Sequence, residues 1–359
     1  MDQEFLAALS QLEREKGISK EVVLEALEAA LISAYRKNFR FSQNVRVDID
    51  RQSGQIRVFA KKKIVDDVLD PRVEISFDAA KKIDVNCKVN DMLELEVTPS
   101  DFGRIAAQTA KQVITQRIRE AEKLVIFKEY EQKVGDILIG VVRRFDKRCY
   151  YVDLGKIEAI LPYDELILKE KFNLNSQVKA YVTSVEMSNK GPFIYLSRKH
   201  QGFLKRLLEL EIPEIYEGLV EIHNIAREAG FRSKIAVYSK SEDIDPVGSC
   251  IGNNGFRIKA ISKQLHNEKI DIIKWSKEID EFIVNSLNPA KVLKVLVNEE
   301  MKEAKVIVAD EQLSLAIGRD GQNVRLAAKL TGFRIDIKAF SSFKDSLGGT
   351  KFEKEVQEN

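Results

Sequence analysis

Cysteine and histidine are scarce in this chain, which has three of each among its 359 residues. Cys87, Cys149 and Cys250 are scattered and odd in number, so they indicate neither a disulfide framework nor a zinc site and are typical of reduced thiols in a cytosolic protein. We expect Cys149 and Cys250, which lie in apolar or strand-forming stretches, to be small buried side chains. The histidines form no cluster with cysteine or aspartate, so the sequence predicts no metal, no cofactor and no catalytic site.

Long apolar runs and a strong net charge are missing as well. No apolar run approaches the ~20 residues of a membrane span, and the first four residues lack the basic and apolar parts of a signal peptide. Hydrophobic residues make up 44% of the chain, which indicates globular domains rather than disorder. The net charge is only +2, so binding of nucleic acid would depend on local basic patches. We therefore expect a cytoplasmic protein, and a monomer, with roughly two to four domains.

The first 130 residues predict an α+β domain. Apolar residues at helical spacing predict helices over 2–15 and 19–38, and alternating patterns over 45–50 and 55–59 predict a hairpin. Residues 64–97 mix strand and loop, and a long helix is predicted over about 101–130. The region contains no catalytic grouping of residues. We therefore expect a surface that docks on another protein, although these residues do not name the partner.

Residues 131–199 predict a small β-barrel. Five short strands are expected at 137–142, 149–154, 159–161, 177–185 and 193–197, which suits a barrel of the OB type. The stretch Tyr151-Val152-Asp153-Leu154-Gly155 resembles the RNA-binding OB barrel first named from ribosomal protein S-one. Such barrels stack bases on aromatic side chains beside basic residues, so Tyr151 and Arg143 are candidates for RNA binding. An ordinary half-exposed strand aromatic is the alternative for Tyr151, whereas Tyr150 alternates to the opposite face and should pack in the core.

Two loops of the same form follow, Gly252-Asn253-Asn254-Gly255 and Gly318-Arg319-Asp320-Gly321. Each lies in a predicted order of helix, loop, helix and strand. Glycine allows a tight turn and close approach of another backbone, and the free N–H groups at the start of a helix favour phosphate. A single loop of this form is usually an ordinary turn between helices. Two copies in the same setting favour a pair of KH units, whose GXXG loop binds the backbone of single-stranded nucleic acid.

The KH units are expected over 200–277 and 278–344, each with the bacterial order α-β-β-α-α-β, and residues 345–359 are expected to form a flexible tail. The chain as a whole is thus predicted to be a multidomain α+β protein. Asp320 would repel a phosphate, so it should point outward or accept hydrogen bonds from a base, and Trp275 should pack between the units. The candidate RNA-binding residues of the KH pair are Gly252, Asn253, Asn254, Gly255, Arg257, Lys259, Gly318, Arg319, Asp320, Gly321, Gln322, Asn323, Arg325, Arg232 and Lys234.

The order of these parts resembles the NusA family of bacterial transcription elongation factors over roughly residues 1–340. The stretches 226–237, 245–248 and 316–327 carry most of the resemblance, while Ala229 stands where the family commonly has proline. The resemblance implies an N-terminal domain that docks on RNA polymerase near the RNA exit channel. It also implies a continuous surface for nascent single-stranded RNA, and a role in pausing, termination and antitermination with NusG, NusB and ribosomal protein S-ten.

Two alternatives were weighed against this interpretation. An exoribonuclease that degrades RNA with phosphate also carries KH and S-one modules, but this chain has no room for its large catalytic domains. A translation-linked or ribosome-linked RNA-binding protein would leave the N-terminal 130 residues unexplained. We therefore expect a regulator of transcription that is not an enzyme.

Overall fold

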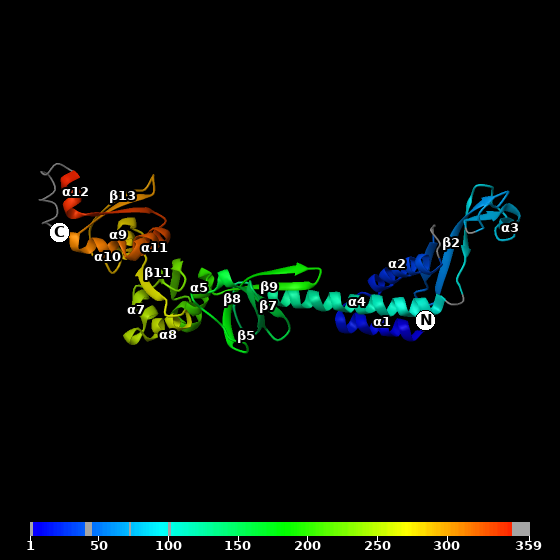
Figure 1. The fold of residues 1–359 in the computed structure, drawn as a ribbon, viewed down its shortest axis with the longest axis horizontal. Coiled ribbons are helices and arrows are strands. Elements are labelled where there is room, and N and C mark those ends of the chain that lie inside the picture. Colours follow the sequence, from blue (N-terminus) through cyan, green and yellow to red (C-terminus); the bar gives the residue numbers. More distant parts are fainter. Residues whose placement is uncertain (1–2, 40–44, 72, 100–101, 347–359) are drawn as a thin grey trace. The chain divides into compact units, whose positions relative to one another are not determined.

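A computed structural model describes residues 3–39, 45–71, 73–99 and 102–346 of the chain. It divides into two compact units, Met1–Phe127 and Lys128–Asn359, and Figure 1 labels many of their elements. The predicted tail lies outside the described residues from residue 347 onward. In the part of the chain that the structure describes, no helix is long and apolar enough to cross a membrane.

The N-terminal unit combines helices with a four-stranded sheet (Figure 1). The predicted helices and hairpin are present, and β2 also pairs parallel with β3 and antiparallel with β4. In chain order the elements are α1 (Gln3–Lys16), α2 (Lys20–Phe39), β1 (Val45–Ile49), β2 (Ile56–Val65), β3 (Glu74–Ser76), α3 (Phe77–Lys81), β4 (Met92–Glu96) and α4 (Phe102–Glu131).

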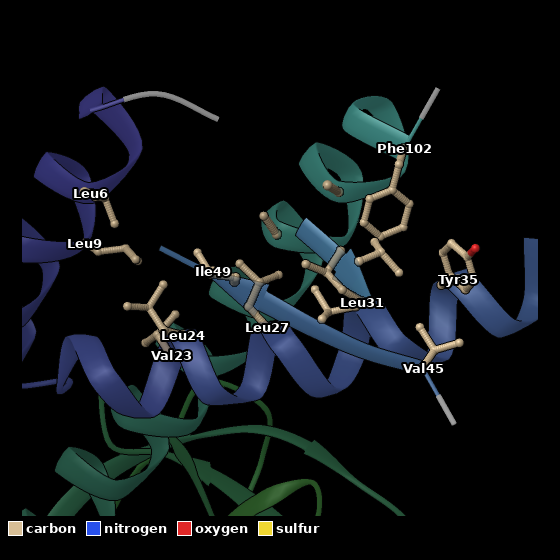
Figure 2. Packing of buried hydrophobic residues seen from close by; sticks show 14 residues of the cluster. Leu6, Leu9, Val23, Leu24, Leu27, Leu31, Tyr35, Val45, Ile49 and Phe102 are labelled. Atoms are coloured by element: carbon tan, nitrogen blue, oxygen red, sulfur yellow. The ribbon is translucent and has the colours of Figure 1, made fainter. Parts of the chain in front are cut away.

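The core of this unit lies between α1, α2, β1 and the first turns of α4 (Figure 2). Leu24, Leu27 and Leu31 of α2 are fully buried, as their helical spacing predicts, and burial of such a side chain stabilises a fold by roughly 1.5–3 kcal/mol. Tyr35 meets Phe102 edge to face, with ring centroids 5.7 Å apart. Further along α4, Val125 is 62% exposed.

The second unit begins with the predicted five strands, which close into a barrel in the order β5-β6-β7-β9-β8. They are β5 (Ile137–Phe145), β6 (Cys149–Asp153), β7 (Glu158–Pro162), β8 (Gln177–Ser188) and β9 (Gly191–Ser197). Tyr150 is buried, as predicted, and so are Cys149 and Cys250, which like Cys87 are free thiols. That this barrel is of the OB type found in ribosomal protein S-one stays a prediction.

Two helices link the barrel to the next sheet, α5 (Gln201–Glu211) and α6 (Pro213–Tyr216). The helix α5 ends at Glu211, with Ile212 as its C-cap. Pro213 then begins the short helix α6, where its missing N–H costs nothing and its fixed φ suits a first turn. The apolar face of α5 is buried through Phe203, Leu204 and Leu207.

The remaining elements form two units with the same topology, as predicted. In each sheet the first two strands are antiparallel and the last strand pairs parallel with the second. The first unit contains β10 (Val220–Glu228), β11 (Arg232–Ser239), α7 (Pro246–Ile251), α8 (Phe256–Gln264) and β12 (Lys269–Lys274). The second contains α9 (Ile279–Ser286), β13 (Val292–Asn298), β14 (Glu303–Val308), α10 (Leu313–Ile317), α11 (Gln322–Thr331) and β15 (Arg334–Ala339), followed by a helix that we did not expect, α12 (Phe340–Ser346).

Candidate nucleic-acid interface

The two GxxG loops have the same backbone conformation. In the loops Gly252–Gly255 and Gly318–Gly321, φ is 71° and 76° at the first glycine, 53° and 52° at the third residue, and 72° and 71° at the last glycine. The third residues are Asn254 and Asp320, and these two residue types tolerate a left-handed backbone better than most. The aspartate of the second loop therefore fits the same turn as the asparagine of the first.

Each loop leads directly into a helix, and its last glycine is the residue before the helix begins. The free N–H groups of the first turns of α8 and α11 therefore lie at the loops, where an anion is favoured. A Cβ atom on Gly255 would meet only Lys259, at 3.7 Å, and one on Gly321 would meet only Arg325, at 3.9 Å. The last glycine of each loop is therefore approachable from outside.

The first glycine of each loop packs against the helix that follows. A Cβ atom on Gly252 would lie 2.9 Å from Arg257, and one on Gly318 would lie 2.7 Å from the Asn323 side chain. Both of these side chains turn back toward the preceding helix. Arg257 donates to the Ser249 carbonyl at 2.6 Å, and Asn323 donates to the Ala316 carbonyl at 3.0 Å.

Arg257 and Asn323 were both predicted to bind RNA, and the structure gives both of them internal partners. Arg257 also pairs with Glu214 of α6, with its Nη1 2.8 Å from the carboxylate. Asn323 is buried and donates to the Leu287 carbonyl as well, at 3.0 Å. These internal hydrogen bonds tie both side chains to the helices that precede the loops, so both residues help to hold the loops in position.

Two basic side chains donate hydrogen bonds to the backbone of the loops themselves. Lys259 donates to the Asn254 carbonyl at 2.9 Å, and Arg325, at the equivalent place in the second unit, donates to the Asp320 carbonyl at 3.1 Å. Both side chains are exposed. Lys259 places positive charge beside the last glycine of its loop, where a phosphate would lie. Arg325 lies at the same place in the second loop and shares its charge with an ion-pair partner, Glu228.

The middle residues of the loops face solvent. Asn253 and Asn254 are exposed, and the Arg319 and Asp320 side chains are 95% and 88% exposed. Asp320 therefore points outward, as expected. Its carboxylate lies 3.6 Å from the Arg319 guanidinium, which offsets part of its charge.

The structure brings the second loop's helix against the first KH unit. Glu228, at the end of β10, accepts hydrogen bonds from Gln322 at 2.8 Å and from Arg325 at 2.6 Å. The Arg325 guanidinium beside it holds the pKa of Glu228 below its ordinary value. The sequence gives no signal for Glu228, because its partners lie more than 90 residues further along the chain.

Apolar packing completes this junction between the KH units. Trp275 packs, as predicted, against a cluster contributed by both units, and its indole stacks on His223 with centroids 4.6 Å apart. The buried members of the cluster are Ala226, Ala236 and Ile273 from the first unit and Phe282, Leu326 and Leu330 from the second.

Arg232 and Lys234 were predicted to bind RNA, and the structure places both in internal ion pairs. Arg232 binds Asp271 through its Nε at 2.6 Å. Lys234 is fully buried, with its Nζ 2.8 Å from the Asn288 carbonyl and 3.3 Å from Asp271. Burial lowers the pKa of Lys234 to about 8, although Asp271 acts in the opposite direction. The prediction for Lys234 was wrong, because a fully buried ammonium cannot reach a phosphate at the surface.

In the barrel, the ring of Tyr151 is covered on one face. The Arg144 guanidinium lies 3.4 Å from the ring centroid and also pairs with Glu158. It occupies the place that a base stacked on that face would take. Arg143, the other candidate, is exposed and pairs with Asp153 at 3.1 Å. Stacking on Tyr151 stays a prediction.

Buried ion pairs connect the barrel with the first KH unit. Arg198, which follows β9, pairs with Glu170 and donates to the Gln264 carbonyl of α8 at 2.9 Å. Arg227 pairs with the buried Glu268 and donates to the carbonyl of Arg198 at 3.0 Å. Glu268 also accepts from the backbone N–H of Gly230 at 2.9 Å, which fixes the turn between β10 and β11.

Among the described residues, no group of His, Cys, Asp and Glu side chains is placed to hold a metal ion.

Comparisons with known proteins match most of the chain. Three family models match: the NusA N-terminal domain over residues 4–124, the NusA-like first KH domain over 198–275, and the NusA-like second KH domain over 279–345. Three relatives named transcription termination/antitermination protein NusA are similar over nearly the whole chain. The relative from Halalkalibacterium halodurans is 56% identical over 96% of this chain and 90% of its own length. Those from Bacillus subtilis and Thermus thermophilus are 58% and 44% identical over 94% and 93% of this chain and 91% and 89% of their own lengths.

Proposed function

The chain belongs to the NusA family of transcription termination/antitermination proteins, and on this premise we propose that it is a non-enzymatic elongation factor that binds RNA polymerase and nascent single-stranded RNA. The observation that carries the RNA-binding half is the identical conformation of the two GxxG loops, each opening a helix with a basic side chain beside its last glycine.

The proposed RNA surface is narrower than the sequence suggests. It consists of the exposed loop residues and the basic side chains that reach them, with Arg143 and Tyr151 on the barrel. Arg257, Asn323, Arg232 and Lys234 support this surface from inside. The proposed loop contacts are Gly252, Asn253, Asn254, Gly255, Lys259, Gly318, Arg319, Asp320, Gly321, Gln322 and Arg325.

We assign polymerase docking to the N-terminal unit. It contains no residues of the RNA-binding surface, and it matches a domain that occurs in proteins named for termination and antitermination. Docking would hold the RNA surface at a high local concentration near the transcript, so each loop can bind RNA weakly and still act. NusG, NusB and ribosomal protein S-ten are proposed as partners in antitermination, and the bacterial cytoplasm as the location.

The proposal includes the domain limits of the sequence analysis, with a barrel over 131–199 and KH units over 200–277 and 278–344. The ribosome-linked alternative is not favoured, because relatives matched over nearly their whole length are named for transcription.

A single-round transcription assay with purified bacterial RNA polymerase and a hairpin terminator tests the proposal. Addition of the protein should change pausing before the hairpin and the fraction of terminated transcripts, and no change at saturating protein would contradict it.

A further inference from the structure

A groove lies between the barrel and the first KH unit, apart from both GxxG loops. It has a volume of about 770 Å³, within the ~300–1,000 Å³ of pockets that take ligands of drug size; a nucleotide is a ligand of this size. Tyr163 and Leu168 line it from the barrel, and Phe231 lines it from the turn between β10 and β11.

Two exposed aromatic residues line the groove from opposite sides. Phe231 is 52% exposed, and its backbone donates to the Glu228 carbonyl and accepts from Lys269. Tyr163 is 37% exposed. Its ring packs edge to face on Tyr150, with centroids 5.0 Å apart, and its hydroxyl donates to the Asp146 carbonyl at 2.7 Å. Exposed aromatic rings on an ordered backbone offer surfaces on which planar groups such as bases can stack.

The charge of the groove favours an anion. Lys169, Lys171 and Lys199 line it and are exposed. Of its three carboxylates, Glu170 is neutralised by the buried Arg198 and Glu228 by Arg325. The third is Asp164, so the lysines outnumber the remaining carboxylate.

Lys169, one of the lysines that line the groove, has a left-handed backbone conformation. Its φ is 67°, in the left-handed region where a residue with a Cβ is strained. It stands in a turn closed by a hydrogen bond from Glu170 to the Ile167 carbonyl, at 3.0 Å. Glycine would fit this turn better, so replacing Lys169 with glycine removes its charge from the groove without straining the turn.

The groove lies next to the residue that follows the second GxxG loop. Glu228 lines the groove and accepts the hydrogen bond of Gln322, the residue that directly follows Gly321. A strand leaving the second loop over Gln322 therefore reaches the groove within the length of one side chain. Because the groove lies so close to the second loop, its ligand is argued to be RNA, the same polymer that the loops are proposed to bind.

We propose that this groove is an additional RNA subsite, which takes one or two nucleotides of a strand bound by the second GxxG loop. Bases stack on Phe231 and Tyr163, and Lys169 and its neighbours face the phosphates. The inference rests on the proposed RNA-binding function and extends the RNA path from the KH units to the barrel.

The test is fluorescence anisotropy of the full chain with unstructured, end-labelled RNAs, lengthened in steps from about 6 to about 16 nucleotides. Phe231→Ala should weaken binding of the longest RNA at least about fivefold, the lower end of the cost of losing one stacked base, and should leave the shortest RNA unaffected. Lys169→Gly should act in the same direction without lowering the melting temperature, because it also relieves the backbone strain.

Two control variants match these substitutions. Phe231→Tyr retains an aromatic ring, and Lys302→Gly removes a lysine from another exposed turn, where φ is 49°; both should bind all RNAs as the unmodified chain does. If Phe231→Ala and Lys169→Gly bind RNA of every length normally while a loop variant such as Gly321→Asp binds weakly, the groove is not an RNA subsite and the proposed function stands. If the unmodified chain binds no RNA of any length, both proposals fail.

Discussion

Arg257 and Asn323 hold the two GxxG loops in the same way, although one is a cation and the other a neutral amide. Each donates to a carbonyl eight residues earlier, at the end of the helix that precedes the loop. Each also packs against the first glycine of its loop, so no side chain fits there. The same loop conformation is therefore supported by two different side chains.

The first prediction concerns the stability of the second KH unit. Asn323→Ala removes the hydrogen bonds to the Leu287, Leu315 and Ala316 carbonyls, two of which are buried bonds. We expect the free energy of unfolding to fall by ~1–3 kcal/mol, because buried carbonyls lose their donor. Urea denaturation of the full chain measures the change. A loss below about 0.5 kcal/mol would show that Asn323 does not hold the loop.

A second prediction separates residues that touch phosphate from residues that hold the loop. Affinity for single-stranded RNA falls by ~0.7 log units per log unit of salt for each phosphate contact. Arg319→Ala should lower this salt slope by about that amount, because its side chain is 95% exposed at the loop. Arg257→Ala should lower affinity through a displaced loop, with the slope unchanged. Equal slopes for Arg319→Ala and the unmodified chain would contradict the role assigned to Arg319.

A third prediction tests the last glycine of each loop. Gly255→Asp and Gly321→Asp together should abolish most RNA binding, because a carboxylate then stands where a phosphate must approach. Both positions have a left-handed φ, so the substitution also adds backbone strain. Gly332→Asp is the matched control, since Gly332 has a φ of 78° and open space around it but lies at the far end of α11. A similar loss of RNA binding in this control would attribute the effect to strain.

The fourth prediction follows from the buried lysine. Burial lowers the pKa of Lys234 to about 8 in the folded chain, against an ordinary value of about 10.4 when unfolded. Between these two values the unfolded state binds more protons, so Lys234 makes stability rise with pH over this window, by at most about 1.4 kcal/mol per pH unit. Lys234→Met should lose this rise, as measured by urea denaturation at pH 7, 8, 9 and 10. Parallel pH profiles for the two proteins would refute the assignment.

The sequence predicted the architecture well because its signals are local. The spacing of Leu24, Leu27 and Leu31 predicted a buried helix face, and alternation along β1 and β2 predicted the hairpin. The two loops were identified by glycines that a left-handed backbone requires. Each of these features depends on residues close together in the chain.

The roles of individual polar residues were predicted less well, because their partners are distant in sequence. Lys234 is buried through a bond to Asn288, 54 residues away, and Asn323 through a bond to Leu287, 36 residues away. A basic or amide side chain near a GxxG loop looks the same in a sequence whether it faces RNA or a backbone carbonyl. The groove between the barrel and the first KH unit was missed for the same reason, since Tyr163 and Phe231 come from separate elements.

Binding to core RNA polymerase tests the central claim most directly, with the full chain compared with residues 128–359, the compact C-terminal unit. Surface plasmon resonance with immobilised polymerase would measure both, and RNA binding would confirm that the shorter chain is folded. The full chain should bind, and residues 128–359 should bind RNA but lose most affinity for polymerase. Undiminished polymerase binding by residues 128–359 would contradict the assignment of docking to the N-terminal unit, and failure of the full chain to bind would contradict the proposed function itself.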